Sequence, residues 1–214
     1  MAGTNISEWR SLVSPNAEGA GEPTIDKYVV RTLREFCEKT RLWQEALTAI
    51  NIVSGTASYT LTHSAADICE VIHARVNGDD IAATNQEYLD LNDPEWRDET
   101  AAYPEHYYTD PITTKIYLVY TPALDITSGL LVYASLKPTL DATTVSDPLY
   151  EDWGEIITFG ASAKLLRNSG MRKENIPMAD YFERKFQQGI AVGKIRGVKG
   201  IASKSPLKRK NYFI

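Results

Sequence analysis

The stretch ICEVIHARVNGDDIAAT, residues 68–84, carries the pattern that decides the expected fold. Its first half is rich in residues that favour strands. Asn77-Gly78 is the strongest two-residue hairpin signal in the chain, because a type I′ turn needs positive φ at both central positions. The sequence therefore predicts a β-hairpin with strands at 68–76 and about 80–84.

Other short β-like runs lie on both sides of this hairpin. They cover residues 47–53, 58–62, 115–120 and 130–136. A long irregular stretch, 88–111, separates the first runs from the last. About six short strands joined by tight turns predict a small antiparallel sandwich or barrel.

Helical patterns flank the β-like runs. Apolar residues recur at helical spacing over 25–42, after Thr24, which suits an N-cap. Asp147 and Pro148 suit the start of a second helical stretch. A last helix is expected over about 177–192. Its expected core residues are Met178, Tyr181, Phe182, Phe186 and Ile190.

These elements predict an α+β fold. We expect a helical body formed by the N- and C-terminal segments, 1–45 and 146–196, with an inserted small antiparallel β lobe, 46–145. Residues 197–214 are expected to form an extended basic C-terminal arm.

The C-terminal segment opposes the charge of the rest of the chain. Residues 194–214 hold seven of the 23 basic residues and none of the 28 acidic ones. The segment also contains glycine and proline and ends in Tyr212-Phe213-Ile214, so it cannot build a core of its own. We interpret this segment as an arm that becomes ordered when it binds a partner.

Composition restricts the class of protein. At 214 residues the chain can bury a real core, and its apolar runs are too short to cross a bilayer. The start of the chain has no signal-peptide pattern, so we expect it to fold in cytoplasm. Residues 1–193 hold 16 basic and 28 acidic residues, a net charge of −12, and this acidic body argues against non-specific wrapping of DNA, which needs a basic surface.

The sequence contains no motif typical of a catalytic, metal-binding or nucleotide-binding site. The three histidines lie far apart, and no nucleophile, phosphate-loop or dinucleotide motif is present. Cys37 and Cys69 are interpreted as reduced, buried thiols. The acidic run 90–95 has a degraded calcium-loop pattern, and an acidic turn with Trp96 packed under it is the alternative. We therefore expect no catalytic site, no metal and no cofactor.

Two features leave alternatives open. Gly189, Gly193 and Gly197 fall every fourth residue, which suits either a close helix seam between subunits or a helix that loosens into the tail. The tyrosines of 88–111 suit either an interface patch or a layer folded back over the sheet.

The order of segments resembles the head-to-tail adaptor (connector) proteins of short-tailed phages. The matching motifs are VRTLREFC at 30–37 with Thr40 and Trp43, IVSG at 52–55 with YTL at 59–61, VNGD at 76–79, YLD at 88–90 with Trp96, YLV at 117–119 with Pro122, ASLKP at 134–138, WGEII at 153–157 with Gly160-Ala161 and Leu165-Leu166, and GIA at 189–191 with Ala179, Tyr181 and Phe186. The similarity runs from about Trp9 to Arg196. Segments 167–177 and the tail depart from the family pattern, because an aromatic residue and more arginines are expected there.

The resemblance implies a structural virion protein at the head-to-tail interface, assembled in the host cytoplasm. Copies would form a homo-oligomeric ring, expected to be dodecameric, beneath the portal protein and above a tail nozzle or tail tube protein. DNA would pass through without sequence-specific binding, and no membrane would be involved. The residues expected to bind the portal are those of the arm: Lys204, Lys208, Arg209, Lys210, Tyr212, Phe213 and Ile214.

Two other functions remain open at this point. The basic tail could be a nucleic-acid-binding module, whose DNA affinity would fall steeply with salt and would persist in the tail alone. An enzyme would need a deep pocket with converging carboxylates or histidines.

Overall fold

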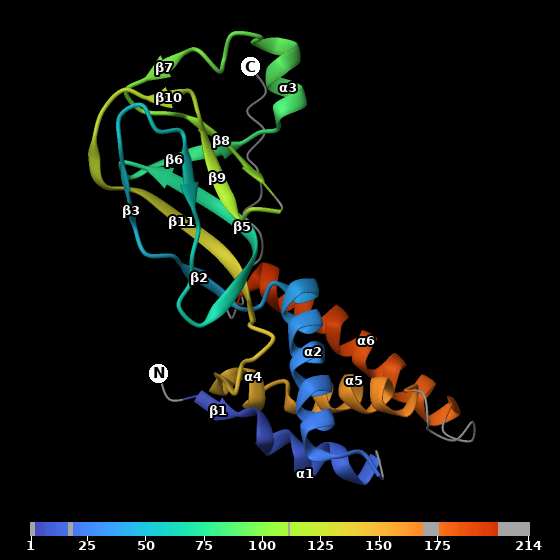
Figure 1. Ribbon diagram of the computed structural model, residues 1–214. Helices are drawn as coiled ribbons and strands as arrows, with labels where there is room; N and C mark the ends of the chain where they lie inside the picture. The colour runs from blue at the N-terminus through green and yellow to red at the C-terminus, as the bar shows by residue number, and fades with distance from the viewer. Residues whose placement is uncertain (1–2, 17–18, 111, 169–175, 201–214) are drawn as a thin grey trace, which may run out of the picture.

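The computed structural model describes residues 3–16, 19–110, 112–168 and 176–200. A curled sheet lies at one end of the molecule and a group of helices at the other (Figure 1). The longer helices are α2 (Glu22–Thr40), α5 (Gly154–Leu166) and α6 (Ile176–Lys199). The shorter helical segments of the described chain are η1 (Ile6–Trp9), α1 (Arg10–Val13), η2 (Ser14–Asn16), α3 (Gln86–Asn92) and α4 (Asp147–Glu151).

The sheet is built around two long strands, β5 (Ala66–Val76) and β11 (Ile126–Pro138). Eight strands form it in the order β2-β11-β5-β6-β8-β9-β4, with β3 also paired to β11. The other six strands are β2 (Gln44–Ala46), β3 (Ile50–Ile52), β4 (Ser58–Thr60), β6 (Asp79–Ala83), β8 (His106–Asp110) and β9 (Lys115–Val119). Two small two-stranded sheets pair β1 (Gly3–Asn5) with β12 (Thr144–Ser146) and β7 (Thr100–Ala101) with β10 (Thr121–Pro122).

The predicted hairpin is confirmed as the turn between β5 and β6. Asn77 and Gly78 both have positive φ, 52° and 93°. Val76 pairs with Asp79, and Ala74 pairs with Ile81, in an antiparallel register. A two-residue loop of this kind matches the twist of the flanking strands, which explains why local sequence was enough to place it.

The sheet curls until its two ends are linked by a short turn. β3 pairs with β11 and β4 pairs with β9, at opposite ends of the strand order, yet only residues 53–57 separate them in the chain. The Tyr59 hydroxyl lies across this turn, donating to the carbonyl of Thr56 at 2.7 Å and accepting from the Val53 amide at 3.1 Å. The curl encloses an apolar core that includes Ile116, Leu118 and Leu130.

The expected fold class, a helical body with an inserted small antiparallel β lobe, is wrong. An eight-stranded sheet replaces the small antiparallel lobe, and β6 pairs with β8 in parallel. The sequence pattern predicted a short run at 130–136 where β11 covers 13 residues, and it missed α3 in the connection to β8. Parallel neighbours far apart in the chain leave no turn signal, so local patterning reads them as separate short strands.

The helices share a second core. Trp9, Phe36 and Phe186 are fully buried in it, and they come from the N-terminal segment, α2 and α6. The indole nitrogen of Trp9 donates to the Gly154 carbonyl at 3.2 Å, which joins the N-terminal segment to the start of α5. Burial of these large aromatic side chains supplies much of the apolar area that holds the helices together.

The three spaced glycines of α6 fit neither interpretation made from the sequence. The helix continues through them, so they do not loosen it, and they face the same chain. A Cβ at Gly189 would lie 2.3 Å from Ile156 of α5, and one at Gly197 would lie 2.3 Å from the Thr40 carbonyl oxygen. Small residues here let α6 approach α5 and the end of α2 closely, within one subunit.

Candidate assembly surfaces

No group of three or more His, Cys, Asp or Glu side chains in the described residues could hold a metal ion. Burial raises the pKa of Cys37 to about 12 and that of Cys69 to about 11, so both thiols stay protonated near neutral pH. Across the described helices, none combines the length and the apolar character needed to cross a membrane.

The acidic run 90–95 forms the end of α3 and the turn that follows it. The Asp90 carboxylate accepts from the Trp96 indole nitrogen at 2.9 Å and from Arg97 at 2.5 Å. These hydrogen bonds, that from Arg97 first, hold the pKa of Asp90 below its usual value. Trp96 is buried beneath the turn, so the interpretation of a packed acidic turn is confirmed.

The outer face of α6 exposes apolar side chains. Tyr181, Val192 and Ile195 are 44%, 59% and 57% exposed, and their spacing puts them on one side of the helix. With 24 residues, α6 is about 36 Å long. We call Tyr181, Val192 and Ile195 the α6 stripe. Apolar residues aligned on an exposed helix face are typical of a surface that another protein covers.

The core predicted for the last helix is correct only in part. Phe182, Phe186 and Ile190 are buried, but Met178 and Tyr181 are exposed. Because α6 carries apolar residues on more than one face, periodicity cannot say which of them face the chain's own core.

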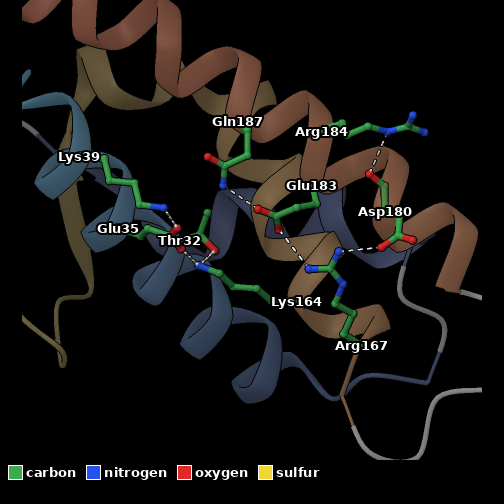
Figure 2. Close-up of polar contacts among 9 residues, drawn as sticks. All are labelled: Thr32, Glu35, Lys39, Lys164, Arg167, Asp180, Glu183, Arg184 and Gln187. Carbon is green, nitrogen blue, oxygen red and sulfur yellow. Dashed lines mark hydrogen bonds and ion pairs between the residues drawn. The ribbon is translucent and has the colours of Figure 1, made fainter.

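A cluster of ion pairs joins α2 to α5. Figure 2 shows Lys164 of α5 reaching Glu35 of α2 at 2.6 Å and Thr32 at 3.2 Å, while Lys39 approaches the other oxygen of Glu35 at 2.5 Å. Partial burial would raise the pKa of Glu35, but the hydrogen bonds from Lys164 and Lys39 offset this, so its pKa is lowered. The carboxylate therefore stays charged and ties α2 to α5.

A second set of polar contacts ties α5 to the start of α6. Arg167, directly after α5, pairs with Asp180 at 2.7 Å and with Glu183 at 3.5 Å (Figure 2). Gln187 donates to Glu183 at 2.6 Å, one turn further along α6. These contacts fix the direction of α6 and hence the direction in which its outer stripe points.

The far end of the sheet carries another exposed apolar surface. Tyr88 and Leu91 of α3 are 59% and 77% exposed and lie three residues apart, and Tyr103 is exposed near them in sequence. We call Tyr88 and Leu91 the α3 tip. Figure 1 places α3 and β7 at the end of the molecule opposite the helices. Tyr107 is buried in the sheet and Tyr108 stacks on Tyr117, so the tyrosines divide between the two interpretations made from the sequence.

The residues expected to bind a portal lie outside the described part of the chain. They are Lys204, Lys208, Arg209, Lys210, Tyr212, Phe213 and Ile214. What the structure adds is the place where the arm leaves the fold. The Gly197 carbonyl accepts from Gln44 of β2 at 3.2 Å, so α6 ends beside the junction between helices and sheet.

The hollow of ≈330 Å³ between the helices and β2 is lined mainly by apolar and glycine residues, and its Asp152 pairs with Arg196 at 2.8 Å. The exposed faces of α6 and α3 are the features that sequence reasoning missed. The exposed apolar residues themselves were visible in the sequence, but their exposure was not.

Comparison with known proteins gives the family. No protein with a curated description matches the chain. The family model described as SU10 adaptor protein matches residues 6–207. This match covers most of the chain and confirms the resemblance to phage head-to-tail adaptors that the order of sequence motifs indicated. Because the matched residues include both apolar cores and the whole of α6, the chain belongs to the SU10 adaptor protein family.

Proposed function

We propose that the protein is a structural head-to-tail adaptor that forms a dodecameric ring between the portal and the tail of a short-tailed phage. The observation that carries the proposal is the α6 stripe. Its apolar side chains are exposed in a single copy although α6 is held firmly by its inner face. An exposed face of this kind on a rigid helix favours contact with another copy of the chain or with the portal.

The two ends of the molecule suit two different partners. The basic arm continues from the end of α6, beside the junction between helices and sheet. We assign the portal to the helices and the arm residues 204–214 to portal clefts. The α3 tip lies at the opposite end, and we assign it to the tail nozzle or tail tube protein. Aromatic and apolar side chains such as those of the α3 tip are enriched at protein interfaces.

The charge of the chain suits passage of DNA through the ring. Residues 1–193 hold 16 basic and 28 acidic residues, a net charge of −12, whereas residues 194–214 hold seven basic residues and no acidic one. Tight binding of DNA requires many contacts between basic side chains and phosphates. A lumen lined by the acidic part of the chain would therefore let DNA slide rather than hold it.

Electron microscopy of the protein mixed with its portal tests the proposal. We expect monomers in the absence of portal, because the arm then has no portal cleft to bind, and rings on portal particles. The double substitution Val192→Asp with Ile195→Asp should abolish the rings, since two charges would be buried at the contact. A stable ring formed without portal would contradict the templated assembly.

A matched control uses an equally exposed apolar residue at the other end of the molecule. Leu91→Asp should leave ring formation on the portal intact and should prevent attachment of the tail component. If Leu91→Asp abolished rings while the α6 double substitution did not, the assignment of the two ends would be reversed.

A further inference from the structure

Two strand edges face each other across a gap in the sheet. β5 pairs with β11 along its whole length, but it pairs with β6 only at residues 74–76. On its other side, β6 pairs with β8 only at His106 and Tyr107. In the described strand pairings, the edge of β5 before Ala74 and the edge of β8 after Tyr107 therefore have no strand partner. Such edges offer backbone donors and acceptors to an added strand.

Bulges in β5 contribute to this gap. Its register against β11 shifts twice, so that Ile72 and Cys69 have no opposite residue on β11. A bulge bends the strand that carries it and increases its twist. The bends separate β5 from β8, whose pairing with β9 runs without a shift.

The gap between β5 and β8 contains a hollow of ≈400 Å³. It is lined from both edges, by Ile68–Val71 of β5 and by Tyr107–Asp110 of β8. It continues into a second hollow of ≈500 Å³, which shares Thr84 and Tyr108–Asp110 with the first. Together they follow the free edge of β8, and their size lies in the range of sites that hold small ligands or a few residues of peptide.

Arg41 links the end of α6 to this hollow. A Cβ at Gly197 would touch the backbone of Thr40 and Arg41. Arg41 in turn pairs with Glu70 at 2.7 Å, and Glu70 lines the hollow. One arginine side chain therefore spans the distance between the end of α6 and the start of the free edge.

The length and sequence of the arm suit the site. The 14 residues of 201–214 span at most about 46–50 Å when extended. A strand of five residues needs only about 17 Å. Residues 207–214 contain neither proline nor glycine and end in aromatic and β-branched side chains, which favour strands. Tethering beside the site also gives the arm a high effective concentration there.

We propose that the groove between β5 and β8 binds residues 207–214 of the same chain as an added strand while the protein is free. In this position the arm covers both free edges and keeps its apolar end out of water. The inference goes beyond the adaptor function, and no portal is needed to test it.

Hydrogen exchange of the full chain, compared with a chain lacking residues 203–214, tests the groove. Amides at 68–71 and 108–110 should exchange at least ten-fold faster without the arm, while amides of α5 should not change. Thr109→Trp, which fills the groove, should give the same loss of protection in the full chain. Thr127→Trp, on an exposed position of β11, is the matched control and should leave the protection intact.

Three results would overturn the proposal. The first is equal exchange at both edges with and without the arm. The second is protection that grows with protein concentration, because the occupant would then be a second copy of the chain. The third is loss of protection in Thr127→Trp as well as in Thr109→Trp, since both substitutions would then act through general destabilisation. Failure of portal binding by the full chain would leave all three measurements unaffected.

Discussion

Truncation of two aromatic residues on α6, Phe186 and Tyr181, should have opposite consequences for stability and assembly. Phe186 is 0% exposed and packs against Phe36, with a ring-centroid distance of 6.4 Å. Replacing a buried aromatic residue with alanine costs about 3–5 kcal/mol. For a chain of this size, each kcal/mol lowers Tm by about 2–4 °C, so Phe186→Ala should lower Tm by about 6–20 °C.

Tyr181→Ala is the matched substitution on the outer face of the same helix. Tyr181 is 44% exposed, and its ring lies 5.7 Å from the Lys185 ammonium group. Surface changes of this kind usually cost within about 0.5 kcal/mol, and an exposed cation–π contact adds about 0.5–1 kcal/mol. Tyr181→Ala should therefore cost at most about 1.5 kcal/mol and should weaken assembly instead.

Urea denaturation followed by tryptophan fluorescence and circular dichroism measures both stabilities. A second measurement, ring formation on portal particles, separates the two roles. If Tyr181→Ala were as destabilising as Phe186→Ala, then α6 would be rotated relative to the arrangement described here. If neither variant lowered Tm by more than a degree or two, the assignment of Phe186 to the helical core would be wrong.

Three further predictions concern other parts of the chain. Gly197→Ala should destabilise the end of α6 by about 1 kcal/mol despite the gain in helix propensity, because its Cβ would meet the Thr40 carbonyl oxygen, and denaturation should show it. The pKa of Glu35 in the folded chain is lowered from its ordinary value of 4.5. The ionised carboxylate therefore stabilises the fold above pH 4.5, and this stabilisation is lost as the pH falls through the lower folded pKa. Glu35→Gln should flatten the acid side of the curve of stability against pH. Deleting residues 203–214 should leave the fold intact and abolish portal attachment, and neutralising Lys208, Arg209 and Lys210 should slow association measured by surface plasmon resonance. A truncated chain that binds portal as well as the full chain would refute the role of the arm.

The parts of the fold that sequence placed correctly depend on local chemistry. Asn77-Gly78 specifies a two-residue turn whatever surrounds it, and Pro23 lies in the first turn of α2, as its missing amide allows. Thr24 was expected to cap α2, but Gly21 takes that position. The helix was therefore predicted correctly, whereas its first residue was not.

The parts that sequence missed depend on partners distant in the chain. The parallel pairing of Ala82 with His106 joins strands separated by α3 and a loop, and no spacing rule marks it. In the sequence, Gly189 and Gly197 cannot be told apart from glycines at a contact between subunits, because their spacing indicates only that something approaches the helix closely. Which helix approaches them is decided by the tertiary arrangement, and here it is α5 and the end of α2 of the same chain.

The same ambiguity explains the error on α6 and points to how its two faces work together. Tyr181 and Phe186 are both aromatic residues at helical spacing, so periodicity assigns both to a core. One is buried within the chain, and the other remains for a partner. Because Phe186 and the glycines fix the inner face, a copy that packs on the α6 stripe would contact a rigid surface. The arm continues from that same helix, so contact between copies would also set the direction from which each arm approaches the portal. Contact between copies and arm docking should therefore be coupled through α6, and loss of either should weaken the other.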